Sequence, residues 1–314
     1  MKRDTPTVEV LLATYQSERF LEELLNSLAN QTYTEFQLTV ADDASTDATL
    51  DILNRCAPLF RQKVKVVRRP QPTGSAQANF AQLLMESQGD YIFLADHDDV
   101  WDEDKIETGL KRLRSLEDQV GSDTPVVTHS DLRVVDADAQ PKAPSLWRLK
   151  AIDPELGCDL RTAVVHATVT GCAMAMNRAT IARCGPIPPE AIMHDWWLNL
   201  VAAAFGRVDF DPQPRLRYRV HGSNVSRPRP PSPWPILRQR HALQVLRTKV
   251  ARRMDQAHAF AERFGPAAPP PLAEFLADLR QFPGLGPIAR RKMLIQHSMW
   301  MPGLWRNAGL LVAV

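Results

Sequence analysis

The first 95 residues alternate between short apolar runs and amphipathic stretches, and this order restricts the possible folds more than any other feature. The apolar runs are rich in β-branched residues, as strands are, and the stretches between them carry apolar residues at helical spacing. Because parallel strands need crossover connections, we expect a largely parallel sheet covered by helices on both faces. The predicted strands are 8–13, 36–40, 64–67 and 91–95, and the predicted helices are 17–28 with Ser17 as N-cap, 47–60 and 75–87.

The second half of the chain is more mixed and ends in a proline-rich, basic region. Strand-like runs occupy 125–135, 168–176, 206–210 and 216–220, and helical patterns occupy a segment ending near 184 and residues 194–205. Prolines at 227–235 break the pattern before a long helical stretch at 236–264 and shorter amphipathic pieces up to 314. We therefore predict an α/β region over 1–227, with halves 1–125 and 126–227, and a helical C-terminal extension over 228–314.

The charge of the chain is divided unevenly between these two parts. The formal net charge is only +2, but residues 228–314 hold 13 Lys and Arg against 4 Asp and Glu. A basic extension on an acidic body indicates an anionic partner, such as a membrane surface or nucleic acid, or else a solvated helical face. We expect no leader sequence and no spanning helix, and the four cysteines lack metal-site spacing, so the chain is expected to be cytoplasmic.

Three carboxylates crowd into four residues directly after the predicted strand 91–95. They belong to the sequence Asp96-His97-Asp98-Asp99. Like charges this close repel one another, so such a cluster is typical of a cation site, and hard oxygen ligands suit Mg²⁺ or Mn²⁺. The alternative is a solvated acidic turn in front of the next helix.

Two further predicted strands also end in polar residues, Thr14-Tyr15 and Asp42-Asp43. In open parallel sheets, ligands bind at the carboxyl ends of the strands. The chain contains no glycine-rich phosphate loop of the dinucleotide or P-loop type. A bound phosphate would therefore be held by a metal ion rather than by a glycine cradle.

The order of these motifs resembles family 2 inverting glycosyltransferases of the GT-A fold, over about residues 7–226. The last two of the motifs resemble the bacterial rhamnosyltransferase-like members in particular. The motifs that carry the resemblance are Ala13-Thr14-Tyr15, Ala41-Asp42-Asp43-Ala44-Ser45-Thr46-Asp47, Leu94 to Trp101, Thr170-Gly171-Cys172-Ala173-Met174, His194-Asp195-Trp196-Trp197 and Tyr218 to Asn224.

The resemblance implies a nucleoside diphosphate sugar donor, UDP- or dTDP-linked, with Mg²⁺ or Mn²⁺ on its diphosphate. Asp98 and His221 would hold the metal, with Asp99 as a further candidate ligand. Taken alone, His221 is typical of a hydrogen-bonded surface histidine. The implied donor-binding residues are Thr14, Tyr15, Asp42, Asp43, Asn79, Asp96 and Arg219.

An inverting transferase also needs a general base for the acceptor hydroxyl, and we select Asp195. Its position at the start of a predicted helix is equally explained by the helix dipole. The neighbouring Trp196 and Trp197 are equally typical of core residues. Because consecutive helical residues cannot share a face, the alternative is that one stacks on a sugar and the other packs inward. The predicted acceptor-binding residues are Gly171, His194, Trp196 and Trp197.

The expected reaction is transfer of a sugar, with rhamnose as a candidate, to a saccharide or lipid-linked acceptor in bacterial surface polysaccharide or O-antigen assembly. Two alternatives are a metal-dependent nucleotidyltransferase and a non-catalytic basic protein that binds nucleic acid or membrane. The carboxylates at the strand ends argue against the latter, so no nucleic-acid partner is expected. The basic extension would lie on the anionic inner face of the cytoplasmic membrane or pack against a domain or subunit.

Position 44 departs from the family pattern, because an alanine stands where the resemblance leads us to expect glycine. The turn after Asp43 must therefore avoid a positive φ or tolerate strain.

Overall fold

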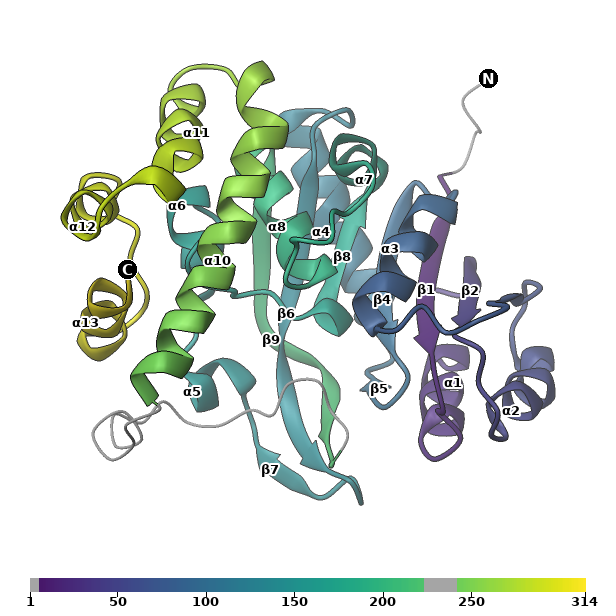
Figure 1. Cartoon of the computed structure of the whole chain (residues 1–314). Coiled ribbons are helices and arrows are strands. Elements are labelled where there is room, and N and C mark those ends of the chain that lie inside the picture. Colours follow the sequence, from purple (N-terminus) through teal and green to yellow (C-terminus); the bar gives the residue numbers. More distant parts are fainter. Residues whose placement is uncertain (1–5, 223–241) are drawn as a thin grey trace.

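The computed structural model describes residues 6–222 and 242–314, and its centre is a nine-stranded mixed sheet (Figure 1). The strands are β1 (Val8–Thr14), β2 (Phe36–Asp42), β3 (Lys65–Arg68), β4 (Tyr91–Asp96), β5 (Val100–Trp101), β6 (Val126–Asp136), β7 (Pro141–Ala143), β8 (Met174–Asn177) and β9 (Arg207–Val220). Their order in the sheet is β3-β2-β1-β4-β8-β6-β9-β5, with β7 paired to β6. The predicted α/β fold with a helical C-terminal region is confirmed.

Helices cover both faces of this sheet. Along β1 the side chains alternate between two hydrophobic clusters, with Leu11 in one and Val10 and Leu12 in the other. One face is covered by α1 (Leu21–Ala29), α2 (Thr49–Cys56) and α4 (Lys105–Val120), and the other by α3 (Ala76–Glu86), α7 (Arg178–Cys184) and α8 (His194–Phe205). Shorter helices are η1 (Ala57–Leu59), α5 (Leu146–Lys150), η2 (Pro154–Gly157), α6 (Leu160–Ala163) and η3 (Gly171–Ala173).

The sheet is parallel in its first half and mixed beyond it. Strand β1 pairs parallel to both β2 and β4, in a register that sets Thr14 beside Asp42 and Ala13 beside Asp96. Strand β8 runs antiparallel to β4 and β6, whereas β6 and β9 are parallel. The three polar strand ends predicted from the sequence therefore lie together at one edge.

Two boundaries differ from the sequence prediction. The runs 206–210 and 216–220 form one strand, β9, because its pairing with β6 continues across register shifts at residues 130–133 of β6. Helix α1 begins at Leu21, four residues after Ser17, whose hydroxyl accepts a hydrogen bond from the Tyr15 amide at 3.0 Å. Ser17 is therefore not the N-cap.

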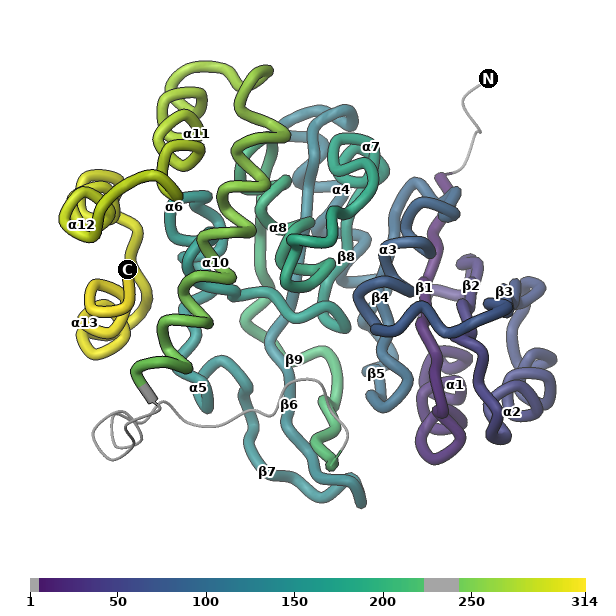
Figure 2. The backbone as a smooth tube through the Cα atoms, viewed as in Figure 1, coloured from purple at the N-terminus to yellow at the C-terminus, as the bar shows by residue number. Residues whose placement is uncertain are grey.

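The C-terminal extension is part of the main hydrophobic core. Its long helix α10 (Ala242–Phe264) lies across α8, and smaller helices follow beside it (Figures 1 and 2). One cluster of buried residues runs from Leu11 of β1 to Leu310 near the C-terminus. The described part of the extension is therefore not an independent unit, and the predicted boundary at 227/228 lies outside the described residues. The following helices are η4 (Gly265–Ala267), α11 (Leu272–Gln281), η5 (Phe282–Gly284), α12 (Pro287–Gln296) and α13 (Leu304–Ala313).

Ala44 adopts the left-handed backbone conformation, with φ at +60°. An L-residue with a Cβ atom adopts this region at a cost of about 1–2 kcal/mol. Flanking contacts hold the turn, because Asp42 accepts a hydrogen bond from the Ser45 amide at 3.0 Å and Asp43 donates its amide to Thr14 at 2.9 Å. The sequence left open whether this turn avoids a positive φ or tolerates strain, and the structure shows that it tolerates strain.

Candidate active site

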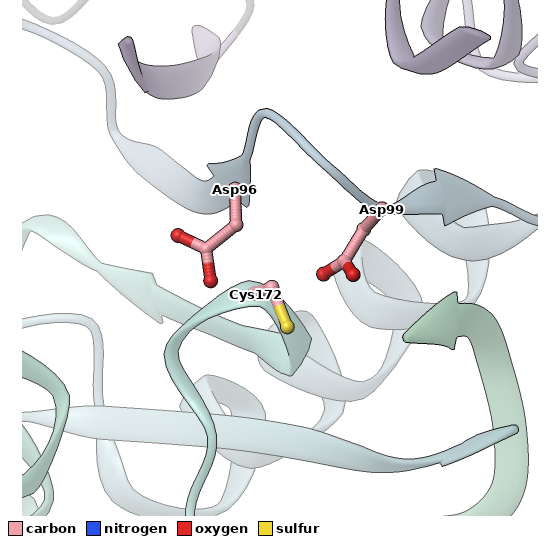
Figure 3. Close-up of side chains that lie close together, drawn as sticks. All are labelled: Asp96, Asp99 and Cys172. Atoms are coloured by element: carbon pink, nitrogen blue, oxygen red, sulfur yellow. The ribbon is translucent and has the colours of Figure 1, made fainter. Parts of the chain in front are cut away.

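The carboxylates after β4 face one another at the polar edge of the sheet. Figure 3 shows the carboxylates of Asp96 and Asp99 on either side of the Cys172 thiol. The three candidate ligand atoms lie within 4.8 Å of one another. Asp99 and Cys172 are fully buried, whereas Asp96 is partly exposed. Cys172 was not among the predicted residues, although it directly follows Gly171, which was.

Burial and mutual repulsion raise the proton affinity of these carboxylates. Burial, followed by the negative charges of Asp98 and Asp195, raises the pKa of Asp96 to about 7. Burial, followed by the negative charges of Asp98 and Asp96, also raises the pKa of Asp99 well above its ordinary value. The folded protein thus holds negative charge here at an energetic cost that a bound cation would offset.

Asp98 and His221 meet although they are far apart in the sequence. His221 follows the end of β9, and its Nε2 lies 2.8 Å from Oδ2 of Asp98. The His221 ring also packs on Phe20, with the ring centres 4.9 Å apart. The structure therefore brings together the two residues predicted to hold a metal ion.

The donor set at this edge fits a hard divalent cation. Asp96 and Asp98 supply carboxylate oxygens and His221 an imidazole nitrogen, a combination that Mn²⁺ or Mg²⁺ accepts, whereas the Cys172 thiol is a soft ligand that suits neither. Oδ2 of buried Asp99 has no hydrogen-bond partner among the described residues. Its other oxygen accepts the Arg219 amide at 3.1 Å, which ties the acidic turn to β9.

Arg219 is buried behind the site and stabilises its backbone. The residue is only 2% exposed, and its guanidinium donates to the carbonyl oxygens of Asp98 and Ala137, each at 2.9 Å, and to the carboxylate of Glu23. The sequence prediction of direct donor binding by Arg219 does not fit this burial. We assign it a positioning role at the base of the Asp98–Asp99 turn.

Most of the residues predicted to bind the nucleotide are likewise buried in the wall of the site. Asp42 is fully buried and accepts hydrogen bonds from Thr14 and the Ser45 amide, while Asp43 accepts two from Thr73. Asn79 donates to the carbonyl oxygen of Ala41 at 2.9 Å. Thr14, Asp42 and Asn79 therefore build the wall instead of offering free groups to a ligand.

Tyr15 is the most exposed of the predicted donor-binding residues. It follows β1 at the same edge and is 53% exposed, whereas Thr14 beside it is 1% exposed. An exposed aromatic ring at the end of a central strand offers a flat surface on which a nucleoside base can stack.

Helix α8 brings Asp195 and His194 to the other side of the carboxylates. A Cβ atom on Gly171 would lie 3.2 Å from Nε2 of His194 and 3.4 Å from Oδ2 of Asp195, so a glycine permits this close approach. His194 is 3% exposed and stacks on Phe80 at 4.2 Å, and burial lowers the pKa of its imidazole. Gly171, His194 and Asp195 therefore lie close together, and their role in an acceptor site stays a prediction.

The two tryptophans after Asp195 are both buried. Trp196 is 7% exposed, and its indole nitrogen donates to the carbonyl oxygen of Ala163 at 2.7 Å. Trp197 is fully buried, and its ring centre lies 5.4 Å from that of Phe260 in α10. Burial against α10 excludes Trp197 from an open acceptor pocket, which corrects that sequence prediction, because its helix face points into the core.

A buried cation lies beneath the cluster and was not anticipated. Lys105, at the start of α4, is 4% exposed, and its Nζ sits 3.7 Å from the centre of the Trp101 ring. Burial lowers its pKa to about 8, while the nearby Cys172 and Asp99 raise it. Lys105 therefore offsets part of the negative charge of Asp99 from the interior side.

Comparison with known proteins identifies the family. The sequence model described as glycosyl transferase family 2 matches residues 9–181, more than half of the chain. This chain belongs to glycosyl transferase family 2. The matched segment contains the strand ends, the acidic turn and Gly171, while Asp195 and His221 lie beyond it.

Curated relatives and solved structures resemble the chain at low identity. The dTDP-rhamnosyl transferase RfbG of Shigella flexneri is 26% identical over 221 residues, covering 68% of this chain and 72% of RfbG. The crystal structure of S. aureus TarS 1–349 with UDP has a TM-score of 0.55 at 15% identity, covering 98% of this chain and 89% of TarS 1–349. The mannosyltransferase PcManGT from Pyrobaculum calidifontis, in complex with GDP-Man and Mn²⁺, has a TM-score of 0.55 at 19% identity, covering 98% and 86%.

These likenesses establish the GT-A glycosyltransferase fold. The chain spans 66%, 41% and 60% of the length of the first three curated relatives that it matches. Within the described residues, no helix combines the length and apolar character needed to cross a membrane.

A cavity of about 550 Å³ lies away from these family 2 motifs, between α4 and the start of β9. It is lined by residues that include Arg112, Cys158 and Arg207. The start of β9 is at the opposite end of the sheet from His221, so this cavity does not belong to the carboxylate site.

Proposed function

We propose that this family 2 protein is an inverting glycosyltransferase that moves a sugar from a nucleoside diphosphate donor to a hydroxyl group of a saccharide or lipid-linked acceptor. The observation that carries the proposal is the placement of Asp195 against the acidic turn: its charge acts on Asp96, while Asp98 faces His221 at 2.8 Å. A candidate base therefore adjoins a candidate diphosphate site, as a single displacement requires.

The donor lies along the carboxyl ends of β1, β2 and β4. The base stacks on Tyr15, and the wall formed by Thr14, Asp42 and Asp43 fixes the position of that ring. Asp96 and the Asp98–His221 pair would hold Mg²⁺ or Mn²⁺, and a bound cation would neutralise the charge that develops on the leaving diphosphate. Arg219 and Asp99 keep the acidic turn in register with β9.

The acceptor enters from the α8 side, beside Gly171 and His194. Asp195 accepts the proton from the acceptor hydroxyl as that oxygen attacks the anomeric carbon, and the configuration at this carbon inverts in the one displacement. Gly171 lacks a Cβ atom, and this lets His194 and Asp195 approach the carboxylate side of the site closely.

The relatives support a role in bacterial surface polysaccharide assembly. RfbG is named as a dTDP-rhamnosyl transferase, and TuaG of Bacillus subtilis, 31% identical over 106 residues, as a putative teichuronic acid biosynthesis glycosyltransferase. A structure of TarS contains UDP-GlcNAc. These names support a UDP- or dTDP-linked donor, with dTDP-rhamnose as one candidate.

Thermal-shift screening of nucleoside diphosphate sugars tests the donor site. Because a ligand that binds only the folded state stabilises it, the true donor at about 100 times its Kd, with Mn²⁺ present, is expected to raise Tm by about 5–10 °C. In Asp98→Asn the Mn²⁺-dependent part of this shift is expected to disappear. A larger shift with nucleoside triphosphates than with any diphosphate sugar would contradict the proposal and favour a nucleotidyltransferase.

We further propose that α12 and α13 lie on the anionic inner face of the cytoplasmic membrane. Leu304 is 87% exposed, Trp305 75% and Ile288 70%, and basic residues such as Lys292 lie on the same two helices. Exposed apolar side chains beside basic ones are typical of helices that lie in a membrane interface.

Flotation with vesicles tests this surface without removing helices that belong to the core. The full chain is expected to float with phosphatidylcholine vesicles containing 30% phosphatidylglycerol, and Leu304→Ser/Trp305→Ser is expected to reduce the bound fraction at least about tenfold. The control is Leu59→Ser/Val66→Ser, which removes two exposed apolar residues from the half formed by residues 1–125. Equal flotation of both variants and the wild type would contradict the membrane proposal.

A further inference from the structure

Three cationic side chains from separate parts of the chain meet beside Asp195. Lys150 ends α5, Arg253 lies in α10 and Arg306 lies in α13. Arg306 donates hydrogen bonds to the carbonyl oxygens of Lys150 at 2.6 Å and Ala151 at 3.1 Å. The Arg253 guanidinium lies 5.9 Å from the centre of the Trp196 ring. The extension thus contributes two of the three charges of this cationic cluster, formed by Lys150, Arg253 and Arg306.

In the described part of the chain, no carboxylate forms an ion pair with the cationic cluster. The sequence of residues 223–241 contains no Asp or Glu at all. The negative charge that acts on Lys150 is that of Asp195. The cluster therefore carries an excess of positive charge next to the proposed base.

The charges are partly withdrawn from water and repel one another. Burial, followed by the charge of Arg306, lowers the pKa of both Lys150 and Arg253. Burial and all three cations together lower the pKa of His166 to about 3. Nε2 of this neutral, buried imidazole has no hydrogen-bond partner among the described residues.

Holding like charges together in a half-buried place is costly unless an anion joins them. The contacts to Lys150 and Ala151 account for two of the five N–H donors of the Arg306 guanidinium, and Arg253 donates to the sulfur of Met301, a weak acceptor. Guanidinium groups bind phosphate oxygens in a bidentate manner. The cluster therefore has the chemistry of a phosphate site.

Its place relative to Asp195 indicates which substrate the phosphate belongs to. The charge of Asp195 acts on Asp96, on the donor side, and on Lys150, in the cluster, and Arg253 lies 5.9 Å from the ring centre of Trp196, the residue after Asp195. The donor diphosphate is already assigned to Asp98 and His221, and the acceptor must reach Asp195. We propose that Lys150, Arg253 and Arg306 bind a phosphate group of the acceptor, next to the hydroxyl that is glycosylated; this rests on the proposed transferase function.

Isothermal titration calorimetry on the full chain tests the site directly. The probes are farnesyl diphosphate, for a lipid-linked diphosphate, and a short glycerol-phosphate oligomer, for a phosphodiester polymer. One of them is expected to bind the wild type, and Lys150→Gln and Arg306→Gln are each expected to weaken it at least about tenfold, because each removes a charged hydrogen bond. Glutamine at 306 retains an N–H donor for the α5 carbonyl oxygens.

The control is Lys111→Gln, which removes the same charge from an exposed position of α4. The proposal would be overturned if the control variant lost as much affinity for the probe as Lys150→Gln does, or if neither probe bound the wild type. Competition between the probe and UDP with Mn²⁺ would also overturn it, because the cluster would then belong to the donor. Failure of every nucleotide sugar to bind, with probe binding retained, would instead refute the transferase function alone.

Discussion

Replacing Asp195 with asparagine is expected to lower kcat by about 10³-fold while the Kd for the nucleoside diphosphate stays within about twofold of the wild type. Asparagine has nearly the same shape but cannot take the proton from the acceptor hydroxyl. The side chain approaches Gly171 and His194, on the acceptor side, so donor contacts remain. Release of nucleoside diphosphate measures kcat, and calorimetry measures the donor Kd.

Glu190→Gln is the matched control, because this carboxylate is exposed in the loop before α8. It is expected to leave kcat unchanged. Turnover of Asp195→Asn at more than about a tenth of the wild-type rate would remove Asp195 as the base. A parallel loss of donor affinity would instead place Asp195 in the donor site.

Replacing Phe260 with alanine is expected to lower the free energy of unfolding by about 3–5 kcal/mol. Phe260 is fully buried, and its ring centre lies 5.4 Å from Trp197 and 4.7 Å from Phe264. Truncation leaves a cavity between α8 and α10 that rigid helices fill only in part. Urea denaturation followed by tryptophan fluorescence and by circular dichroism gives the difference.

Lys249→Ala, on the exposed side of α10, is the control and is expected to change the free energy of unfolding by less than about 0.5 kcal/mol. A change below about 1 kcal/mol for Phe260→Ala would show that the extension is not part of the core. Two separate unfolding transitions in the wild type would contradict the single core in the same way.

The sequence was sufficient where the local pattern determines the structure. The alternation of strands and helices up to Asp96 predicts parallel strands. Parallel strands place Thr14, Asp42 and Asp96 at one edge of the sheet, independently of how the rest of the chain folds. The pairing of Asp98 with His221 came from the family resemblance, because no local pattern links residues so far apart.

The misassigned residues depend on long-range packing. Arg219 appears as a free cation in the sequence, but its guanidinium is bound by Glu23, Asp98 and Ala137, and no spacing rule predicts partners so distant. Trp197 follows a catalytic candidate, yet the face it occupies is decided by α10. No local pattern in the sequence marks Cys172 as a site residue. It lies between two carboxylates because η3 places it there.

The packing of Trp197 against Phe260 has a consequence for protein engineering. Asp195 and Trp197 lie on the same turn of α8. The extension therefore packs against the helix that carries the proposed base and stabilises its position. A chimera that exchanges the extension for that of a relative, in order to change acceptor choice, would also exchange this support. Such grafts are expected to work only when the aromatic residues of α8 and α10 are transferred as one unit.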